Sequence, residues 1–128
     1  MSMLRGNLPG LLALFLGALA VSAGAQSTPP LASGVTEDAA SAAQLYDRAC
    51  RGADASGCNS LGYFYERLDA SRAAQLYERA CQLANPSGCD NLAVLYEGGN
   101  GVTRDRNRAA KLRQQACELA PRPSCRRD

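Results

Sequence analysis

The chain has 128 residues, which allows one small domain at most, and it carries 14 basic and 12 acidic side chains. It has no histidine, which excludes hydrolases whose metal ion is held by histidine ligands. Charge is distributed unevenly, because residues 26–102 carry five basic and nine acidic groups, whereas residues 103–128 carry eight basic and three acidic groups.

The basic C-terminal segment, residues 103–128, has two interpretations. It is either a site for an anionic partner, such as polyanionic cell-wall material or an acidic protein, or a solvated arginine-rich helix face. No aromatic residues are interleaved with its basic ones, so the composition argues against nucleic-acid binding.

The N-terminus has the layout of a secretory signal peptide. Arg5 precedes a short apolar run, residues 11–21, and the small-residue site Ala23-Gly24-Ala25 follows. The run is shorter than the ~20 apolar residues that a membrane-spanning helix needs. We therefore expect a signal peptide at residues 1–25, cleavage after Ala25 and a periplasmic or secreted protein. Residues 26–36, with two prolines, are expected to form a disordered leader.

Three segments of the remaining chain share the pattern Asp-x3-Ala-Ala-x-Leu-x3-Ala-Cys, and they superimpose without gaps. Each begins with an aspartate that is a candidate helix N-cap, because its carboxylate can accept hydrogen bonds from the free amides of the first turn. Apolar residues in each copy follow the i, i+3, i+7 spacing of one helix face. The copies are Asp38 to Cys50, with Ala42, Leu45 and Ala49; Asp69 to Cys81, with Ala73, Leu76 and Ala80; and Asp105 to Cys117, with Ala109, Leu112 and Ala116.

A second shared segment follows the first two copies. It runs from Ser56 to Glu66 and from Ser87 to Glu97, and its leucine, small and tyrosine positions again step as a helix. The serines are candidate N-caps. The small residue, Gly62 or Ala93, is expected to let a neighbouring helix approach closely.

The repeating unit is therefore helix, turn, helix, with a period of 31 and then 36 residues. The five-residue difference is the glycine-rich turn Gly98–Val102. The expected fold is all-α: an α-α superhelix, a short solenoid of about two and a half helical hairpins. Its five helices, each of about 10 to 14 residues, should begin near residues 38, 58, 69, 88 and 105. The repeat domain covers residues 37–125, in units of about 38–68, 69–104 and 105–128.

Six cysteines fall at the hairpin turns, three at the ends of first helices and three located eight positions later. Antiparallel helices joined by a short turn bring such positions within disulfide range. The repeat geometry selects one disulfide per hairpin, and on a chain-entropy estimate each nine-residue loop contributes roughly 2 to 3 kcal/mol. The spacing fits neither zinc-binding nor redox-active cysteine motifs, so no metal or other cofactor is expected. The predicted pairs are Cys50–Cys58, Cys81–Cys89 and Cys117–Cys125.

These residues carry a family resemblance. The hairpin unit resembles the Sel-one-like repeat, a relative of the tetratricopeptide repeat. The match is clearest from Asp90 to Leu112, where a leucine-small-x-x-tyrosine helix is followed by a G-x-G-V turn and an aspartate-led helix with paired alanines. The cysteine pair in each hairpin is similar to bacterial cysteine-rich secreted members of that family. The resemblance covers residues 38–125.

The resemblance implies a scaffold that binds a protein partner through its concave face or an open end. Two departures from the family pattern bear on this surface: the first unit lacks the glycine turn, and the third has no predicted second helix after Cys125. The helix at 105–119 could therefore use its open face for a partner or a homodimer, or cover that face with its own polar residues. The groove-facing positions that the resemblance implies are Asn59, Tyr63, Glu66, Asp90, Val94 and Glu97; alternatively, these serve packing and solvation.

Two other functions remain open at this stage. One is a periplasmic immunity or inhibitor protein that blocks a toxin or hydrolase. The other is enzymatic, because some cysteine-rich relatives carry a β-lactamase or penicillin-binding label. Serine enzymes of that class use an S-x-x-K motif, whereas the chain's only lysine, Lys111, follows Arg108 by three residues. The acidic pair Asp47 and Glu78 occupies equivalent positions in successive units, as a solvated face also would. The sequence therefore predicts no enzyme.

Overall fold

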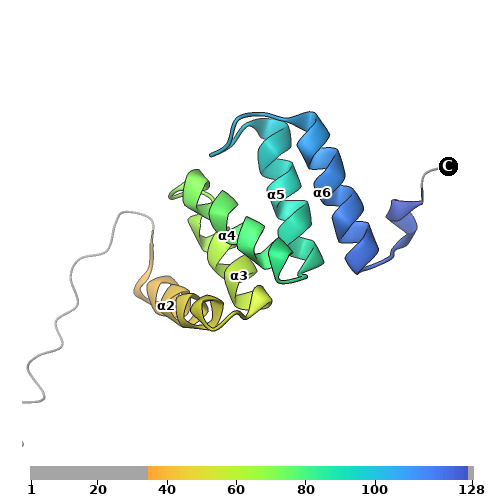
Figure 1. Ribbon diagram of the computed structural model, residues 1–128. Coiled ribbons are helices and arrows are strands. Elements are labelled where there is room, and N and C mark those ends of the chain that lie inside the picture. Colours follow the sequence, from red (N-terminus) through yellow and green to blue (C-terminus); the bar gives the residue numbers. More distant parts are fainter. Residues whose placement is uncertain (1–34, 127–128) are drawn as a thin grey trace, which may run out of the picture. The chain divides into compact units, whose positions relative to one another are not determined.

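The computed structural model describes residues 35–126, and within them the fold is entirely helical. The predicted signal peptide, residues 1–25, lies outside the described residues, as do residues 26–34 of the predicted leader. None of the described helices is both long and apolar enough to cross a membrane. The elements, labelled as in Figure 1, are α2 (Glu37–Arg51), α3 (Ala55–Tyr65), α4 (Ala70–Gln82), α5 (Pro86–Gly98), α6 (Arg106–Leu119) and a 3-10 turn, η1 (Pro123–Cys125).

Each helix packs against the next one along the chain, and α3 also contacts α5. Figure 1 shows the chain reversing direction between α4 and α5 and again, through a longer loop, between α5 and α6. The predicted array of five helices in antiparallel hairpins is confirmed.

The turns inside the first two hairpins, α2–α3 and α4–α5, are built in the same way. The helix ends in a residue with left-handed φ, Ala53 (φ 65°) or Ala84 (φ 67°), whose amide bonds back into the last helical turn. The next residue, Asp54 or Asn85, donates its amide to the carbonyl five residues earlier, which completes a Schellman motif. Its side chain then caps the following helix by accepting from the amide three residues on. One residue thus ends one helix and starts the next.

This double role explains where the N-cap predictions for the second helices were wrong. Ser56 and Ser87 were expected to cap α3 and α5, but each lies in the first turn of its helix. The helices begin earlier than the predicted residues 58 and 88, because Asp54 and Asn85 already supply the capping oxygen.

The aspartate caps of the first helices are confirmed in two copies out of three. Asp69 and Asp105 accept from the amides three residues on, each at 3.0 Å. Asp38 lies instead in the first turn of α2, where its negative charge interacts favourably with the positive end of the helix dipole. Thr36 caps α2 through its hydroxyl at 3.1 Å, so this residue of the predicted leader belongs to the folded domain.

The turn after α6 differs from the other two at one residue. Pro121 stands where the first two hairpins have Asp54 and Asn85. Proline has no amide hydrogen for the Schellman bond and no side-chain oxygen for a cap. Ala120 is accordingly extended (φ −142°, ψ 89°), and only the 3-10 turn η1 follows.

All three predicted disulfides are present, with Cα separations of 4.5, 4.6 and 5.6 Å. The first two are buried beside a glycine of the second helix, Gly57 or Gly88. A Cβ on either glycine would lie 2.6 Å from the Cβ of Ala49 or Ala80, so these glycines permit the close helix approach. The third disulfide joins α6 to η1 and is partly exposed.

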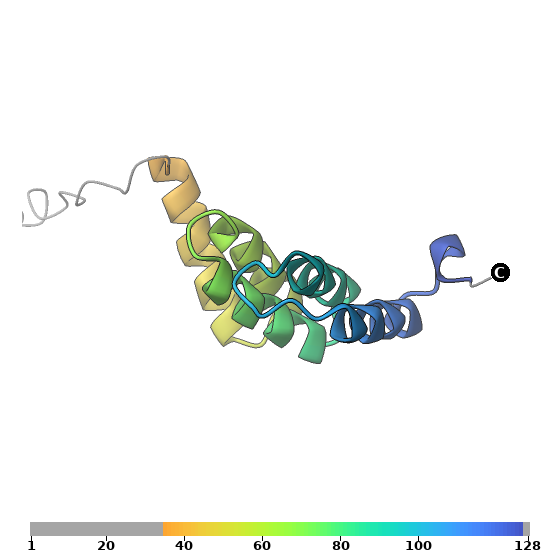
Figure 2. The ribbon, with the colours of Figure 1, turned by 90° about the horizontal axis from the view of Figure 1, so that it is seen from above.

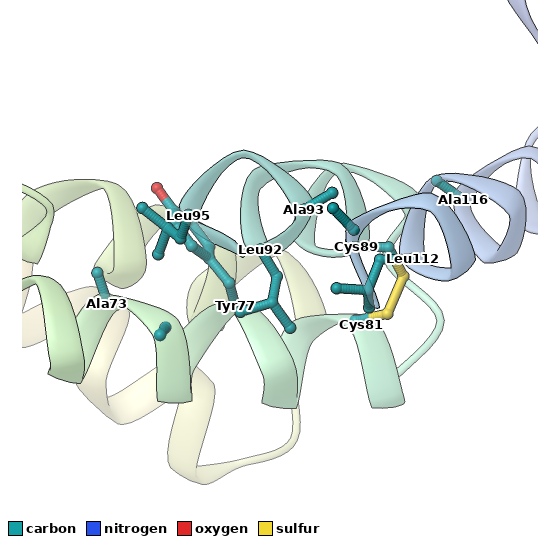
Figure 3. Close-up of a cluster of buried hydrophobic side chains, with 11 residues drawn as sticks. Ala73, Tyr77, Cys81, Cys89, Leu92, Ala93, Leu95, Leu112 and Ala116 are labelled. Carbon is teal, nitrogen blue, oxygen red and sulfur yellow. A yellow bond between two sulfur atoms is a disulfide. The ribbon is translucent and has the colours of Figure 1, made fainter. Parts of the chain in front are cut away.

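The main core lies between α4, α5 and α6 and is made of alanines, leucines, a disulfide and one tyrosine, Tyr77 (Figure 3). The predicted apolar stripe is fully buried on α6 and nearly so on α4. On α2 it is not: Leu45 is 63% exposed, because no helix covers that side of α2 within residues 35–126. A smaller cluster of Cys50, Cys58 and Ala80 joins the first hairpin to α4.

The predicted glycine-rich insertion lies outside the repeating framework. The amide of Asp69 bonds to the carbonyl of Tyr65, and the amide of Asp105 bonds to the carbonyl of Tyr96 in the same way. The first pair is closed by a tight turn and the second by a longer loop, which reaches back to the start of α4 (Figure 2). There a Cβ on Gly101 (φ 70°) would overlap the backbone of Ala70.

Candidate functional site

The six predicted partner-binding residues lie on α3 and α5 and fall into two groups. Tyr63 and Val94, one repeat apart, are exposed by 73% and 51% and form the apolar part of this face. Beside them the amide of Asn91 donates to the side-chain oxygen of Asn59 at 3.0 Å, which ties α5 to α3. Asn59 is therefore half-buried and already bonded within the chain.

The acidic members of the set make structural bonds. Glu66 accepts a hydrogen bond of 2.7 Å from the hydroxyl of Tyr77. Tyr77 is completely buried, and its ring lies against Gly62, where a Cβ would come within 2.6 Å of Cε1. Burial raises the pKa of the Tyr77 phenol well above its usual value, and the bond to the Glu66 carboxylate raises it further.

Glu97, one repeat later, forms a bidentate pair with Arg113. The Nε and one terminal nitrogen of the guanidinium donate to the two carboxylate oxygens at 3.0 and 2.8 Å. The hydrogen bond from Arg113 lowers the pKa of the Glu97 carboxyl below its ordinary value. The pair is exposed, so it joins α5 to α6 at the surface.

Asp90, near the start of α5, pairs with Arg122 in the segment after α6. Its other oxygen, Oδ1, is buried and has no hydrogen-bond partner. The bond holds the C-terminal segment against α5. Of the six predicted residues, then, Tyr63 and Val94 are the two that are free of such bonds and widely exposed.

The donors to the two glutamates, Tyr77 and Arg113, were not among the predicted site residues. They occupy the same position of the repeat, directly after the shared leucine, and Tyr46 is the counterpart in the first copy. A signal was present, because this position carries a long hydrogen-bonding side chain in all three copies.

A second pair of contacts also repeats. The guanidinium of Arg72 lies 4.2 Å from the ring centroid of Tyr65, and that of Arg108 lies 5.0 Å from the ring of Tyr96. Each arginine follows the N-cap aspartate of its helix by three residues, and each tyrosine comes from the helix before.

Grooves open near both ends of the surface that residues 35–126 form. The first, with a volume of about 510 Å³, lies between α2 and α3. Its walls are mainly apolar and include Ala42, Tyr46, Tyr63, Phe64 and Leu68. Three of its lining residues, Tyr46, Tyr63 and Leu68, are among the exposed large apolar residues of the described chain.

The second groove, of about 590 Å³, lies along α6 at the other end of the domain. Ala110, Arg113, Gln114 and the disulfide Cys117–Cys125 line it. The counterpart of α6 in the second hairpin, α4, packs against the helix that follows it, α5. The groove is therefore the place that a second helix of the third hairpin would take.

The acidic pair considered for catalysis is engaged in ion pairs. Asp47 bonds to Arg51 on the same helix at 2.9 Å, and Glu78 bonds to Arg108 at 3.0 Å. Within residues 35–126, no cluster of three acidic or cysteine side chains could hold a metal ion.

Comparisons with known proteins agree with this architecture. The family model of the Sel1 repeat matches residues 31–54, 55–85 and 86–121. Among solved structures, the chain is similar to cysteine rich protein B of Helicobacter pylori, with 34% sequence identity and a TM-score of 0.61. That match covers 65% of this chain and 66% of the Helicobacter chain, so it spans just under two thirds of that structure. No curated protein matches the sequence.

Proposed function

The chain belongs to the Sel1 repeat family, and from this premise we propose that it is an exported, disulfide-stapled scaffold that binds a protein partner and catalyses no reaction. The described residues form the helical repeats and the three disulfides of such a scaffold. The binding role and the export are the parts that we infer.

The observation that carries the proposal is exposed apolar surface on a cross-linked framework. Large apolar side chains that would normally be buried stand exposed by 39% to 73%. Several of them lie close together on α2 and α3, and an apolar patch of this kind on a soluble domain commonly marks an interaction site. Because each hairpin is closed by a disulfide, the surface is already ordered and little conformational entropy is lost on binding. The exposed residues are Leu45, Tyr46, Tyr63, Leu68, Val94 and Leu119.

Two surfaces are candidates for the partner. The first is the face shared by α3 and α5, where Tyr63 and Val94 supply apolar contact beside the bonded asparagines. The second is the open end along α6, where Arg113 and Gln114 border the partly exposed disulfide. We rank the α3–α5 face first, because Arg113 is already bonded to Glu97.

Export is supported by the sulfur chemistry of the domain. All six cysteines are paired in disulfides, which persist in oxidising compartments and are rare in the cytosol. The predicted signal peptide, residues 1–25, gives a route to such a compartment.

The test is capture from an envelope fraction on the immobilised oxidised protein, followed by mass spectrometry. The variant Tyr63→Ser/Val94→Ser should lose the captured partner, while Arg79→Ser, on an exposed position of α4, should retain it. Retention of no protein by the wild type, or equal retention by all variants, would overturn the proposed face. One tightly held partner would indicate an inhibitor, and several weakly held partners would indicate an adaptor.

The absence of catalysis is tested separately. Purified protein should hydrolyse a chromogenic β-lactam no faster than buffer. A rate above this control that disappears on reduction of the disulfides would show that the scaffold role is incomplete.

A further inference from the structure

The α4–α5 pair shows how this fold holds a helix. Both helices of this pair pack against α3. The Tyr77 ring covers Gly62, and its hydroxyl donates to Glu66, four residues after that glycine. Asn91 of α5 adds the bond to Asn59. A tyrosine, a glycine and a carboxylate thus fix the position of α3.

The same arrangement recurs one repeat later with a different donor. α5 packs against α6, and the fully buried Ala93 takes the place of Gly62. Arg113 replaces Tyr77, and its guanidinium holds Glu97, again four residues after the small residue. The chain therefore contains two helices, α3 and α5, that the next repeat binds in this way. Both present a leucine, a small residue and a glutamate at the same spacing.

The groove between α2 and α3 corresponds in the repeat to the surface of the α4–α5 pair that binds α3. Within residues 35–126, no helix occupies this groove. Tyr46 corresponds to Tyr77 and lines the groove, but it is 39% exposed where Tyr77 is 0% exposed. Phe64 corresponds to the buried Leu95, and Ala42 corresponds to the buried Ala73; both line the groove and are only partly covered.

The family register supports the same conclusion independently. The second match, residues 55–85, contains α3 followed by α4, and the third, residues 86–121, contains α5 followed by α6. The first match, residues 31–54, contains α2 as its one described helix. The counterpart of α3 and α5 is what the first unit lacks in the described part of the chain.

We propose that the α2–α3 groove binds an amphipathic helix of a partner protein that presents a leucine, a glycine directly after it, and a glutamate four residues after the glycine. The glycine would face the Tyr46 ring and the glutamate would accept the Tyr46 hydroxyl, as Gly62 and Glu66 do for Tyr77. This inference goes beyond the proposed function, because it adds the α2–α3 groove as a further partner site, which shares Tyr63 with the α3–α5 face.

Two other occupants fit less well. A second copy of the chain would have to lend α3 or α5, but the leucines of their binding faces, Leu61 and Leu92, are already 1% and 2% exposed. Residues 1–34 contain no aspartate or glutamate, so they cannot supply the carboxylate that the two internal examples share.

The test uses a synthetic probe derived from α3, the helix that a tyrosine of this fold already holds. The peptide covers residues 55–67 with Cys58→Ser, and a lactam between Ser56→Lys and Ser60→Asp keeps it helical. We expect saturable binding to the oxidised full chain by calorimetry, with NMR shifts at Ala42, Tyr46 and Phe64. Absence of saturable binding up to about 1 mM peptide would overturn the inference.

Variants on both sides sharpen the test. Tyr46→Ala should weaken binding about tenfold or more, because aromatic anchors dominate such contacts, and Tyr46→Phe should weaken it less. Leu119→Ala, an exposed position on α6, is the matched control and should bind as the wild type does. The peptide carrying Gly62→Leu should not bind. Circular dichroism checks that each variant is folded.

The remaining outcomes are also decisive. Peptide binding that survives Tyr46→Ala would place the site elsewhere and overturn the inference. A dimer of the chain that Tyr46→Ala dissociates, or cross-links from residues 1–34 into the groove, would overturn the choice of occupant. Capture of an envelope partner together with a failed peptide titration would refute this inference and leave the proposed function standing.

Discussion

The α3–α4 and α5–α6 contacts are the same repeat interface built with different chemistry. In the first, the completely buried Tyr77 donates to Glu66; in the second, Arg113, whose side chain is 44% exposed, holds Glu97. Both interfaces use a glutamate as the acceptor, whereas the donor residue differs with the burial of its position. Tyr77 belongs to the core between α4, α5 and α6, where a guanidinium would be costly to desolvate, while Arg113 faces the groove at the open side of α6.

The two interfaces should differ most in the unfolding free energy that is lost when each donor, Tyr77 or Arg113, is truncated to alanine. Tyr77→Ala should lower the free energy of unfolding by about 3–5 kcal/mol, because it leaves a cavity in the core. Arg113→Ala should change it little, since exposed ion pairs contribute little in water. Denaturant unfolding with the disulfides intact measures both. Equal losses of unfolding free energy in the two variants would contradict the claim that burial makes the Tyr77 contact the stronger one.

The next effect concerns the residue beneath the tyrosine ring. Gly62→Ala should cost about 1–3 kcal/mol, because the new methyl group would lie 2.6 Å from Cε1 of the buried Tyr77. Gly98→Ala is the matched control, since its Cβ would meet only the Asn100 side chain at 3.4 Å. A Gly62→Ala protein as stable as the control would show that the ring moves freely.

A smaller effect isolates the Tyr77 hydroxyl. Tyr77→Phe should cost about 1.5 kcal/mol at neutral pH, the lower end of the usual range for a hydrogen bond to a charged group, because the bond to Glu66 is only partly buried. The raised pKa of Tyr77 adds a pH dependence. Above about pH 10 the unfolded phenol loses its proton while the folded one keeps it, so wild-type stability should fall by about 1.4 kcal/mol per pH unit through this group.

Tyr77→Phe lacks that titration. Unfolding curves at pH 8 to 11 should therefore show the gap between wild type and variant narrowing as the pH rises. Parallel losses in the two proteins would contradict the assignment.

The smallest effect is expected at the exposed pair. Arg113→Gln should return the pKa of the Glu97 carboxyl toward its ordinary value, because the hydrogen bond from Arg113 is the main cause of its depression. A carboxyl with a lowered folded pKa stabilises the fold above its unfolded pKa, and this contribution disappears as the pH falls through the folded pKa. Carboxyl NMR titration of wild type and variant measures the shift, and Arg79→Gln serves as the control. An unchanged Glu97 pKa would show that the bidentate pair does not persist in solution.

The repeat pattern predicted the hairpins and all three disulfides, because a fixed cysteine spacing across a short helical turn leaves one feasible pairing. The caps of α3 and α5 were wrong for a physical reason. Asp54 and Asn85 belong to the Schellman turn of the previous helix, so the capping residue lies ahead of the serine in each hairpin. Comparison of the third copy, where Pro121 stands at this position, could have exposed the role of the residue.

For the proposed partner-binding face, the sequence indicated less than it did for the fold. Its apolar positions, Tyr63 and Val94, are exposed as a binding role requires, but Glu66 and Glu97 serve the interfaces between repeats. Sequence spacing places residues on a helix face without saying which neighbouring helix meets that face. Tyr46 and Tyr77 illustrate this limit, because they occupy the same position of the repeat and differ only in whether a neighbouring helix covers them.

The glycine-rich loop has a consequence for how such chains diversify. The carbonyl of Tyr65 or Tyr96 meets the amide of Asp69 or Asp105 whether a tight turn or a longer loop joins them. The spacing between units is therefore uncoupled from the register of the helices. Duplication of a unit with extra codons at this junction leaves every downstream contact aligned, whereas the same addition inside α4 or α5 would rotate the stripe away from its neighbours.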